Sequence, residues 1–180
     1  QKMNRVLKTG GFVFIVGGAR SGKSSHALSL ALAHEASEKV FMATAQAFDA
    51  EMSVRIEGHR LERGDNWKTI EEPLEVAKII EGLGPGKVIV IDCLTLWLSN
   101  LIHSEKDDAK IKEEIAALAK AFCDAPSVVI GVSNEVGLGL VPENALARRF
   151  RDLSGLMNQA MASNADEAWF IASGLPLRLK

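Results

Sequence analysis

The chain alternates short, continuously apolar runs with longer segments in which apolar residues recur at helical spacing. The apolar runs are rich in β-branched residues and predict buried strands over residues 12–16, 39–45, 88–92, 127–132 and 167–173. Apolar residues three and four positions apart predict helices around 27–32 and over 49–63, 74–83, 104–122 and 143–162. This alternation indicates an α/β fold, in which a mostly parallel sheet carries helices on both faces.

Cap residues and helix breakers set the expected limits of the helices. Ser104 and Asp107 have the spacing of a capping box, so we expect a surface helix from Ser104 that Pro126 terminates. Residues 174–180 are expected to be a short ending after the last strand. The apolar faces of the two long helices are predicted to consist of Ile111, Ile115, Leu118 and Phe122, and of Leu146, Phe150, Leu153, Met157 and Met161.

The first apolar run leads directly into a glycine-rich segment. It reads Gly17-Gly18-Ala19-Arg20-Ser21-Gly22-Lys23-Ser24. This matches the phosphate-loop pattern, in which a glycine and four variable residues are followed by a second glycine, Lys, and Ser or Thr. Glycines let successive backbone N–H groups curl around phosphate oxygens, while Lys23 reaches the β- and γ-phosphates and Ser24 ligates Mg²⁺. The strand before this segment and the helix after it are the required context. The sequence therefore predicts a nucleoside triphosphate site.

The apolar run 88–92 ends in a carboxylate, Asp92. A parallel strand that is buried on both faces delivers such a residue to the C-terminal edge of the sheet, where it can hold Mg²⁺ or its water shell. The alternative is an aspartate that only caps the following helix. Next to a phosphate loop, the metal role is the favoured interpretation.

Two further polar features leave alternatives open. The segment 133–142 places Gly137 and Gly139 beside a strand end, which indicates either backbone that bends close to a ligand or a plain strand-to-helix turn. Three arginines lie on the polar face of the last predicted helix, where such residues are usually solvated, and a contact with phosphate is the alternative. These arginines are Arg148, Arg149 and Arg151.

Composition restricts the class of protein. The 180 residues are 47% hydrophobic and 24% charged, which predicts a single globular domain over 1–180 with a polar extension at 1–10. A net charge of -2 gives no indication of a nucleic-acid partner, and no apolar run is long enough to span a membrane. Cys93 and Cys123 lack C-x-x-C spacing, so we expect reduced thiols and a cytoplasmic location.

Motifs along most of the chain resemble those of one enzyme family. Beyond the phosphate loop they are Met42-Ala43-Thr44-Ala45-Gln46, Arg55-Ile56-x-x-His59-Arg60, Trp67 with Glu71-Glu72-Pro73, Asp92-Cys93-Leu94-Thr95-Leu96-Trp97-Leu98, the segment 133–144, Arg149-Phe150-Arg151-Asp152, Met157-Asn158-Gln159 and Ala165-Asp166-Glu167. With these motifs, residues 12–180 resemble the bifunctional adenosylcobinamide kinase/adenosylcobinamide-phosphate guanylyltransferases of cobalamin biosynthesis. The resemblance implies a P-loop NTPase fold of the recombinase type.

The resemblance implies two reactions. ATP or GTP would phosphorylate the aminopropanol hydroxyl of adenosylcobinamide, and GTP would then supply GMP to that phosphate through a guanylyl-histidine. By motif position this histidine is His59, whose neutral imidazole is a suitable nucleophile near pH 7. Its spacing alone would favour a half-buried or solvated helix histidine. Lys23 would stabilise charge on the phosphates.

Family position also implies contacts to the nucleotide outside the phosphate loop. The residues implied are Ala43, Thr44, Ala45, Arg60, Glu71 and Asp92, in addition to Gly17, Gly18, Ala19, Arg20, Ser21, Gly22, Lys23 and Ser24. The chain departs from the family in having Gly64 where a proline is usual, so the turn after His59 is expected to be looser. The resemblance further implies a homo-oligomer, with a trimer as one form.

Two other functions are compatible with a phosphate loop. One is a different kinase that acts on a small alcohol or nucleotide, with His59 incidental; covalent guanylylation would separate it from the first interpretation. The other is a nucleotide-regulated binding module, which predicts nucleotide-dependent binding of a partner and no transfer to a corrinoid. The absence of a basic surface for nucleic acid weighs against this second function.

Overall fold

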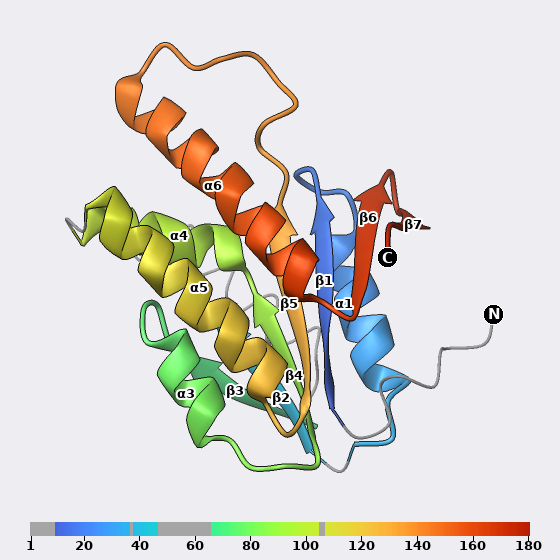
Figure 1. Cartoon of the computed structure of the whole chain (residues 1–180). Coiled ribbons are helices and arrows are strands. Elements are labelled where there is room, and N and C mark those ends of the chain that lie inside the picture. The colour runs from blue at the N-terminus through green and yellow to red at the C-terminus, as the bar shows by residue number, and fades with distance from the viewer. Residues whose placement is uncertain (1–9, 37, 47–65, 105–106) are drawn as a thin grey trace.

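A computed structural model gives the structure of the chain over residues 10–36, 38–46, 66–104 and 107–180. Seven strands in these segments form one sheet, in the order β3-β2-β4-β5-β1-β6-β7 (Figure 1). All neighbouring strands are parallel except β6 and β7, which are antiparallel. The strands are β1 Gly11–Gly17, β2 Glu38–Ala43, β3 Trp67–Glu71, β4 Lys87–Asp92, β5 Val128–Asn134, β6 Glu167–Ala172 and β7 Leu175–Arg178.

Helices cover both faces of this sheet. One face carries α3, α4, α5 and α6, and α1 lies on the other (Figure 1). The helices are α1 Lys23–Leu32, α3 Val76–Gly82, α4 Leu94–His103, α5 Asp108–Asp124 and α6 Ala145–Asn164. The mostly parallel sheet with helices on both faces confirms the predicted fold class.

The central strands are buried on both sides, which explains their continuous apolar sequence. Along β1, Phe12 and Phe14 belong to the core under α3 to α6, whereas Val13 and Ile15 belong to the core beside α1. Ala27 is the matching buried residue of α1. Since successive side chains of a strand point to opposite faces, one apolar run supplies both cores. Five predicted strands are confirmed by this arrangement, although β2 ends at Ala43 rather than at residue 45.

The predicted start of the surface helix at Ser104 was wrong. Residues 94–103 form α4, which was not predicted, and Ser104 closes it by donating its hydroxyl hydrogen to Leu101 O. The cap of α5 is Asp107, whose carboxylate accepts from Lys110 N at 2.9 Å. Its four predicted inward residues are buried. The predicted helix 104–122 therefore corresponds to α5, which begins four residues later, and α4 is an additional helix before it.

Other differences concern the edges of the sheet. The strands β3 and β7 were not predicted; β7 lies in the expected short ending and pairs with β6. Leu146 is 50% exposed, because the first turn of α6 extends beyond the sheet together with the loop that precedes it (Figure 1). The predicted helix 49–63 lies outside the described residues, and so does most of the polar extension 1–10.

Candidate functional site

The C-terminal ends of β1, β5 and β4 form one edge of the sheet, with β5 between the other two strands. A pocket of about 750 Å³ lies at this edge and is called the phosphate pocket below. The parallel register brings Gly17 opposite Asn134, and Asp92 opposite Val132 two residues earlier on β5. The pocket is lined by Ala19, Arg20, Ser21, Gly22, Lys23, Ser24, Ser25, Asp92 and Asn134. The fold thus places most of the glycine-rich segment and Asp92 around one cavity.

Two glycines are required by the shape of the loop. Gly22 has φ 94°, a conformation that favours glycine, and it immediately precedes α1. At Gly17, a Cβ atom would lie 2.5 Å from Ile171 O and 2.7 Å from Ser21 Oγ. The loop therefore packs directly against β6. Gly174 N also donates to Ser21 O at 2.8 Å, so the turn between β6 and β7 supports the loop.

Lys23 lies in the first turn of α1 and is only 8% exposed. Its ammonium group donates to Gly18 O at 2.8 Å, across the mouth of the loop. Burial lowers the pKa of Lys23 from its ordinary value, and the Asp92 carboxylate opposes part of this shift. An ammonium group has three donors, so hydrogens beyond the one bonded to Gly18 remain for phosphate oxygens.

Ser24 and Asp92 supply a hydroxyl and a carboxylate oxygen to the same pocket. Hard oxygen ligands of this kind fit Mg²⁺, which usually keeps several waters and takes its other ligands from substrate phosphates. The described residues contain no group of three or more His, Cys, Asp or Glu side chains that could hold a metal alone. The two residues thus fit a Mg²⁺ ion that binds together with nucleotide, rather than a permanent protein cage.

A buried hydrogen-bond network fixes the end of β5. Ser133 Oγ donates to Asn158 Oδ1 at 2.6 Å, so the 3.3 Å contact between Thr95 Oγ1 and Ser133 Oγ has Thr95 as donor. Thr95 Oγ1 also accepts from Asn134 N at 2.7 Å, and Asn158 Nδ2 donates to Asn134 O at 3.2 Å. Both backbone polar groups of Asn134 are thereby held by side chains. Asn134 was not predicted as a pocket residue, because only the pairing of β1 with β5 brings it there.

The other implied nucleotide residues lie further along the same edge. Ala43 pairs with Asp92 in the register of β2 and β4, and Glu71 is exposed at the end of the edge strand β3. Thr44 is fully buried, with its hydroxyl group bonded to Cys93. None of the three lines the phosphate pocket among the described residues, and Ala45 lines a second pocket. His59 and Arg60 lie outside the described residues, so their predicted roles stay predictions.

The segment after Asn134 is held by arginines of α6. Arg151 Nη2 donates to Gly137 O at 2.6 Å and to Gly139 O at 3.2 Å, and Arg148 Nη1 donates to Pro142 O at 2.9 Å. Arg149 forms an ion pair with Asp108 at 2.7 Å. These arginines do not line the phosphate pocket, so in this structure they support a loop and a helix contact.

Burial also affects the thiol of Cys93, next to Asp92 in the chain. Burial raises the pKa of the Cys93 thiol to about 11, with a further contribution from the Asp92 carboxylate. Cys93 and Cys123 are both free thiols, as predicted.

Within the described segments, no helix is both long and apolar enough to cross a membrane.

Comparison with known proteins gives one family over nearly the whole chain. A sequence model of the family described as "Cobinamide kinase / cobinamide phosphate guanyltransferase" matches residues 13–179. The chain is 38% identical to the bifunctional adenosylcobalamin biosynthesis protein CobU of Escherichia coli K12, over 93% of this chain and 99% of that protein. It is 43% identical to the bifunctional adenosylcobalamin biosynthesis protein CobP of Pseudomonas aeruginosa, over 92% and 95% of the two chains.

Solved structures of low sequence identity share the fold. The assembled ATPase EscN of the enteropathogenic E. coli type III secretion system superposes with a TM-score of 0.61 at 12% identity, over 91% of this chain and 43% of that chain. The RadB recombinase gives a TM-score of 0.54 at 14% identity, over 91% of this chain and 75% of that chain. The likeness to a recombinase agrees with the recombinase-type P-loop architecture expected from the sequence.

Proposed function

The chain belongs to the cobinamide kinase / cobinamide phosphate guanyltransferase family, and we propose that it carries out both reactions on adenosylcobinamide. The observation that supports this most strongly is the phosphate pocket, where Lys23, Ser24 and Asp92 surround one cavity at the sheet edge. These residues suit a nucleoside triphosphate with Mg²⁺, and the cofactors proposed are accordingly ATP or GTP and Mg²⁺.

In the kinase reaction, the aminopropanol hydroxyl oxygen attacks the γ-phosphorus. The bond from this phosphorus to the bridging β–γ oxygen breaks, the nucleoside diphosphate leaves, and the hydroxyl proton is released. Lys23 and the backbone N–H groups of the loop bind the phosphate oxygens and stabilise the charge that develops on them. Ser24 and Asp92 would hold Mg²⁺, which supplies further neutralisation of the phosphate charge.

In the guanylyl transfer, a ring nitrogen of His59 attacks the α-phosphorus of GTP and pyrophosphate leaves. A phosphate oxygen of adenosylcobinamide phosphate then attacks the same phosphorus. The phosphorus–nitrogen bond breaks, the imidazole is regenerated, and adenosylcobinamide-GDP forms. A histidine suits this role because its neutral ring is nucleophilic near pH 7 and its phosphoramidate is reactive. The role of His59 rests on the family motif.

Labelled GTP tests the transferase half. Wild-type protein, His59→Ala and the control His34→Ala would be incubated with Mg²⁺ and GTP labelled on the α-phosphate, and then denatured. We expect acid-labile, alkali-stable label on the wild type and on His34→Ala, and none on His59→Ala. If wild-type protein binds GTP but acquires no label, the transferase proposal is wrong and a P-loop kinase remains. A γ-label transferred to a small alcohol but not to adenosylcobinamide would favour the different kinase.

We also propose that the protein forms a homo-oligomer, for which a trimer is one candidate. Two separate apolar surfaces support this proposal. Leu138 and Leu140, in the loop before α6, are 81% and 97% exposed, and Leu175 and Leu177 on the edge strand β7 are 72% and 59% exposed. Two different surfaces on one subunit can form a head-to-tail contact that closes a ring. Light scattering should give a multiple of 19.4 kDa, and Leu177→Asp should lower it; a monomeric wild type would contradict the proposal.

A further inference from the structure

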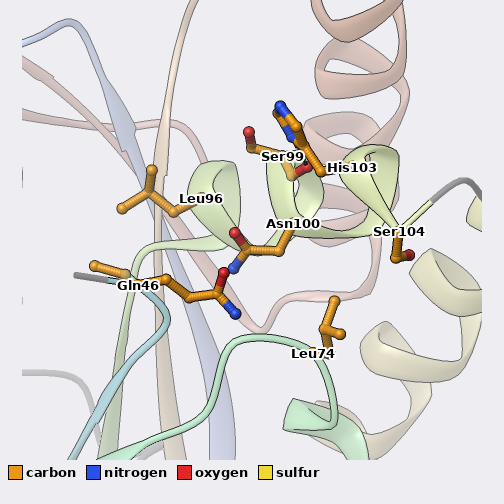
Figure 2. Close-up of a pocket in the computed structure, with 8 residues that line it drawn as sticks. Gln46, Leu74, Leu96, Ser99, Asn100, His103 and Ser104 are labelled. Carbon is orange, nitrogen blue, oxygen red and sulfur yellow. Dashed lines mark hydrogen bonds between the residues drawn. The ribbon is translucent and has the colours of Figure 1, made fainter. Parts of the chain in front are cut away.

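A second pocket opens at the same sheet edge, between α4 and the end of β2. It has a volume of about 520 Å³ and is called the α4 pocket. Gln46 and Asn100 enter it from opposite sides with their carboxamides pointing toward one another, and Leu74 and Leu96 are on its walls (Figure 2). Ser99 and His103 line it from α4. The pocket thus combines amide, hydroxyl and imidazole groups with apolar walls.

The chemistry of this pocket differs from that of the phosphate pocket. Among the described residues that line it there is no Lys, Arg, Asp or Glu, whereas the phosphate pocket contains Arg20, Lys23 and Asp92. A phosphate group would find no Lys or Arg side chain among these described residues. Carboxamide side chains offer both donors and an acceptor, so the α4 pocket suits an uncharged ligand that also carries both.

Two acceptors in the pocket are already oriented by hydrogen bonds. Asn100 Nδ2 donates to Thr44 O at 2.9 Å and to Pro73 O at 3.0 Å, which uses both of its hydrogens and leaves Oδ1 as an acceptor. His103 Nδ1 lies 2.7 Å from Ser99 O; because a carbonyl only accepts, Nδ1 carries the hydrogen and Nε2 of the neutral ring accepts. Fixed acceptors favour a ligand with N–H groups, such as a primary carboxamide.

The α4 pocket is connected to the phosphate pocket through Thr44 and Cys93. Asn100 holds Thr44 O, and the Thr44 hydroxyl holds Cys93, which follows Asp92 in the chain. Three strand spacings separate β2 from β1, or about 14 Å at the usual distance between strands. The pocket lies against α4, on the sheet face opposite to α1. In an in-line transfer the attacking oxygen of the acceptor lies opposite to the leaving oxygen. An acceptor held in the α4 pocket would approach the phosphates from the α4 side of the sheet.

We propose that the α4 pocket binds the carboxamide-bearing rim of the corrinoid acceptor, so that its aminopropanol arm extends to the phosphate pocket. The inference rests on the proposed function, because that function makes the acceptor a cobinamide, a corrin ring whose rim carries carboxamide side chains. Asn100 Oδ1 and His103 Nε2 accept from the amide N–H groups, Gln46 pairs with an amide, and Leu74 and Leu96 contact the apolar ring edge.

Two variants of this pocket test the proposal with matched controls. Gln46→Leu removes the carboxamide at nearly constant size, and Ser99→Leu fills the pocket from α4. The controls are Gln159→Leu and Ser29→Leu, which make the same changes at exposed helix positions outside both pockets. Affinities for adenosylcobinamide and for GTP would be measured separately on the full chain, together with thermal unfolding to verify folding.

We expect both pocket variants to weaken adenosylcobinamide binding about 10-fold without a change in GTP affinity, Gln46→Leu through a lost hydrogen bond and Ser99→Leu because the larger side chain occupies the space of the ligand. The controls should bind both ligands as the wild type does. If the wild type phosphorylates adenosylcobinamide and both variants bind it normally, the pocket assignment is overturned and the proposed function stands. If the two pocket variants bind GTP more weakly but bind adenosylcobinamide normally, the pocket would be assigned to guanine, and this result would also overturn the proposal. A wild type inactive on adenosylcobinamide would instead refute the proposed function.

Discussion

Thr44 and Cys93 join the ends of β2 and β4 through two hydrogen bonds to one hydroxyl group. Thr44 Oγ1 donates to Cys93 O at 2.6 Å and accepts from Cys93 N at 3.0 Å. Both residues are buried, and Cys93 directly follows Asp92. The single hydroxyl therefore satisfies two backbone groups that emerge from a strand end, and it fixes the backbone that presents Asp92 to the phosphate pocket.

Replacing this hydroxyl should reduce both stability and nucleotide binding. Thr44→Val is nearly isosteric but leaves the buried N–H of Cys93 without a partner and its C=O with only the bond from Trp97 N, which should cost about 1–3 kcal/mol in free energy of unfolding. Urea denaturation measures this loss, and GTP titration should show weaker binding because Asp92 is less fixed. Thr44→Ser keeps the hydroxyl and should lose much less. Equal stability of Thr44→Val and Thr44→Ser would contradict the role given to the hydroxyl.

Gly17 and Gly18 are adjacent in the loop but should respond differently to an added methyl group. In Gly17→Ala the Cβ would lie 2.5 Å from Ile171 O, so the loop or β6 must shift, at a cost of about 1–3 kcal/mol. A Cβ at Gly18 meets no described atom within 4 Å, and Gly18→Ala should change the free energy of unfolding by at most about 0.5 kcal/mol. Thermal denaturation of both variants provides the comparison, and a destabilised Gly18→Ala with an unaffected Gly17→Ala would reverse this account.

The parts of the fold that the sequence predicts are those with a strong local signal. The runs that became β1, β4 and β5 are almost continuously apolar because both of their faces are buried. By contrast, β3 reads Trp-Lys-Thr-Ile-Glu on the sheet edge, and β7 contains Pro176 with exposed leucines. Such short polar or exposed edge strands depend on pairing with a neighbour, which local patterns do not contain.

The helix α4 was missed for a related reason. It is buried around most of its circumference, through residues such as Leu94, Trp97 and Leu101, so it lacks the polar face that marks an amphipathic helix. It also continues the apolar run of β4 after only Cys93. In the site, the phosphate loop is a contiguous motif and could be predicted. Asn134 and its support by Asn158 depend on the spatial order of β1, β5 and α6, which the motif does not specify.

Asn158 should matter for the phosphate pocket without lining it. Asn158→Ala removes the acceptor of the buried Ser133 hydroxyl and the donor to Asn134 O, which should cost about 1–3 kcal/mol of stability. The less constrained Asn134 should also lower the rate of phosphoryl transfer. The neighbouring Gln159 is exposed, so Gln159→Ala should match the wild type in urea denaturation and in a steady-state kinase assay. Identical behaviour of the two variants would show that the network does not position Asn134.

The lowered pKa of Lys23 predicts how nucleotide affinity depends on pH. Burial disfavours the charged ammonium in the free protein, whereas bound phosphates favour it, so at high pH the protein must take up a proton to bind. GTP affinity should therefore fall as pH rises through the lowered pKa, before the value of 10.5 at which an ordinary lysine would lose its charge. Lys23→Arg keeps its charge at these pH values and should not show this fall, although its fit to the loop differs. Lys23→Met should bind about 10- to 100-fold more weakly at neutral pH, without the lysine-dependent change. Calorimetry in buffers of different ionisation enthalpy measures the proton uptake directly, and a wild type that takes up no proton on binding at any pH below 10.5 would contradict the assignment to Lys23.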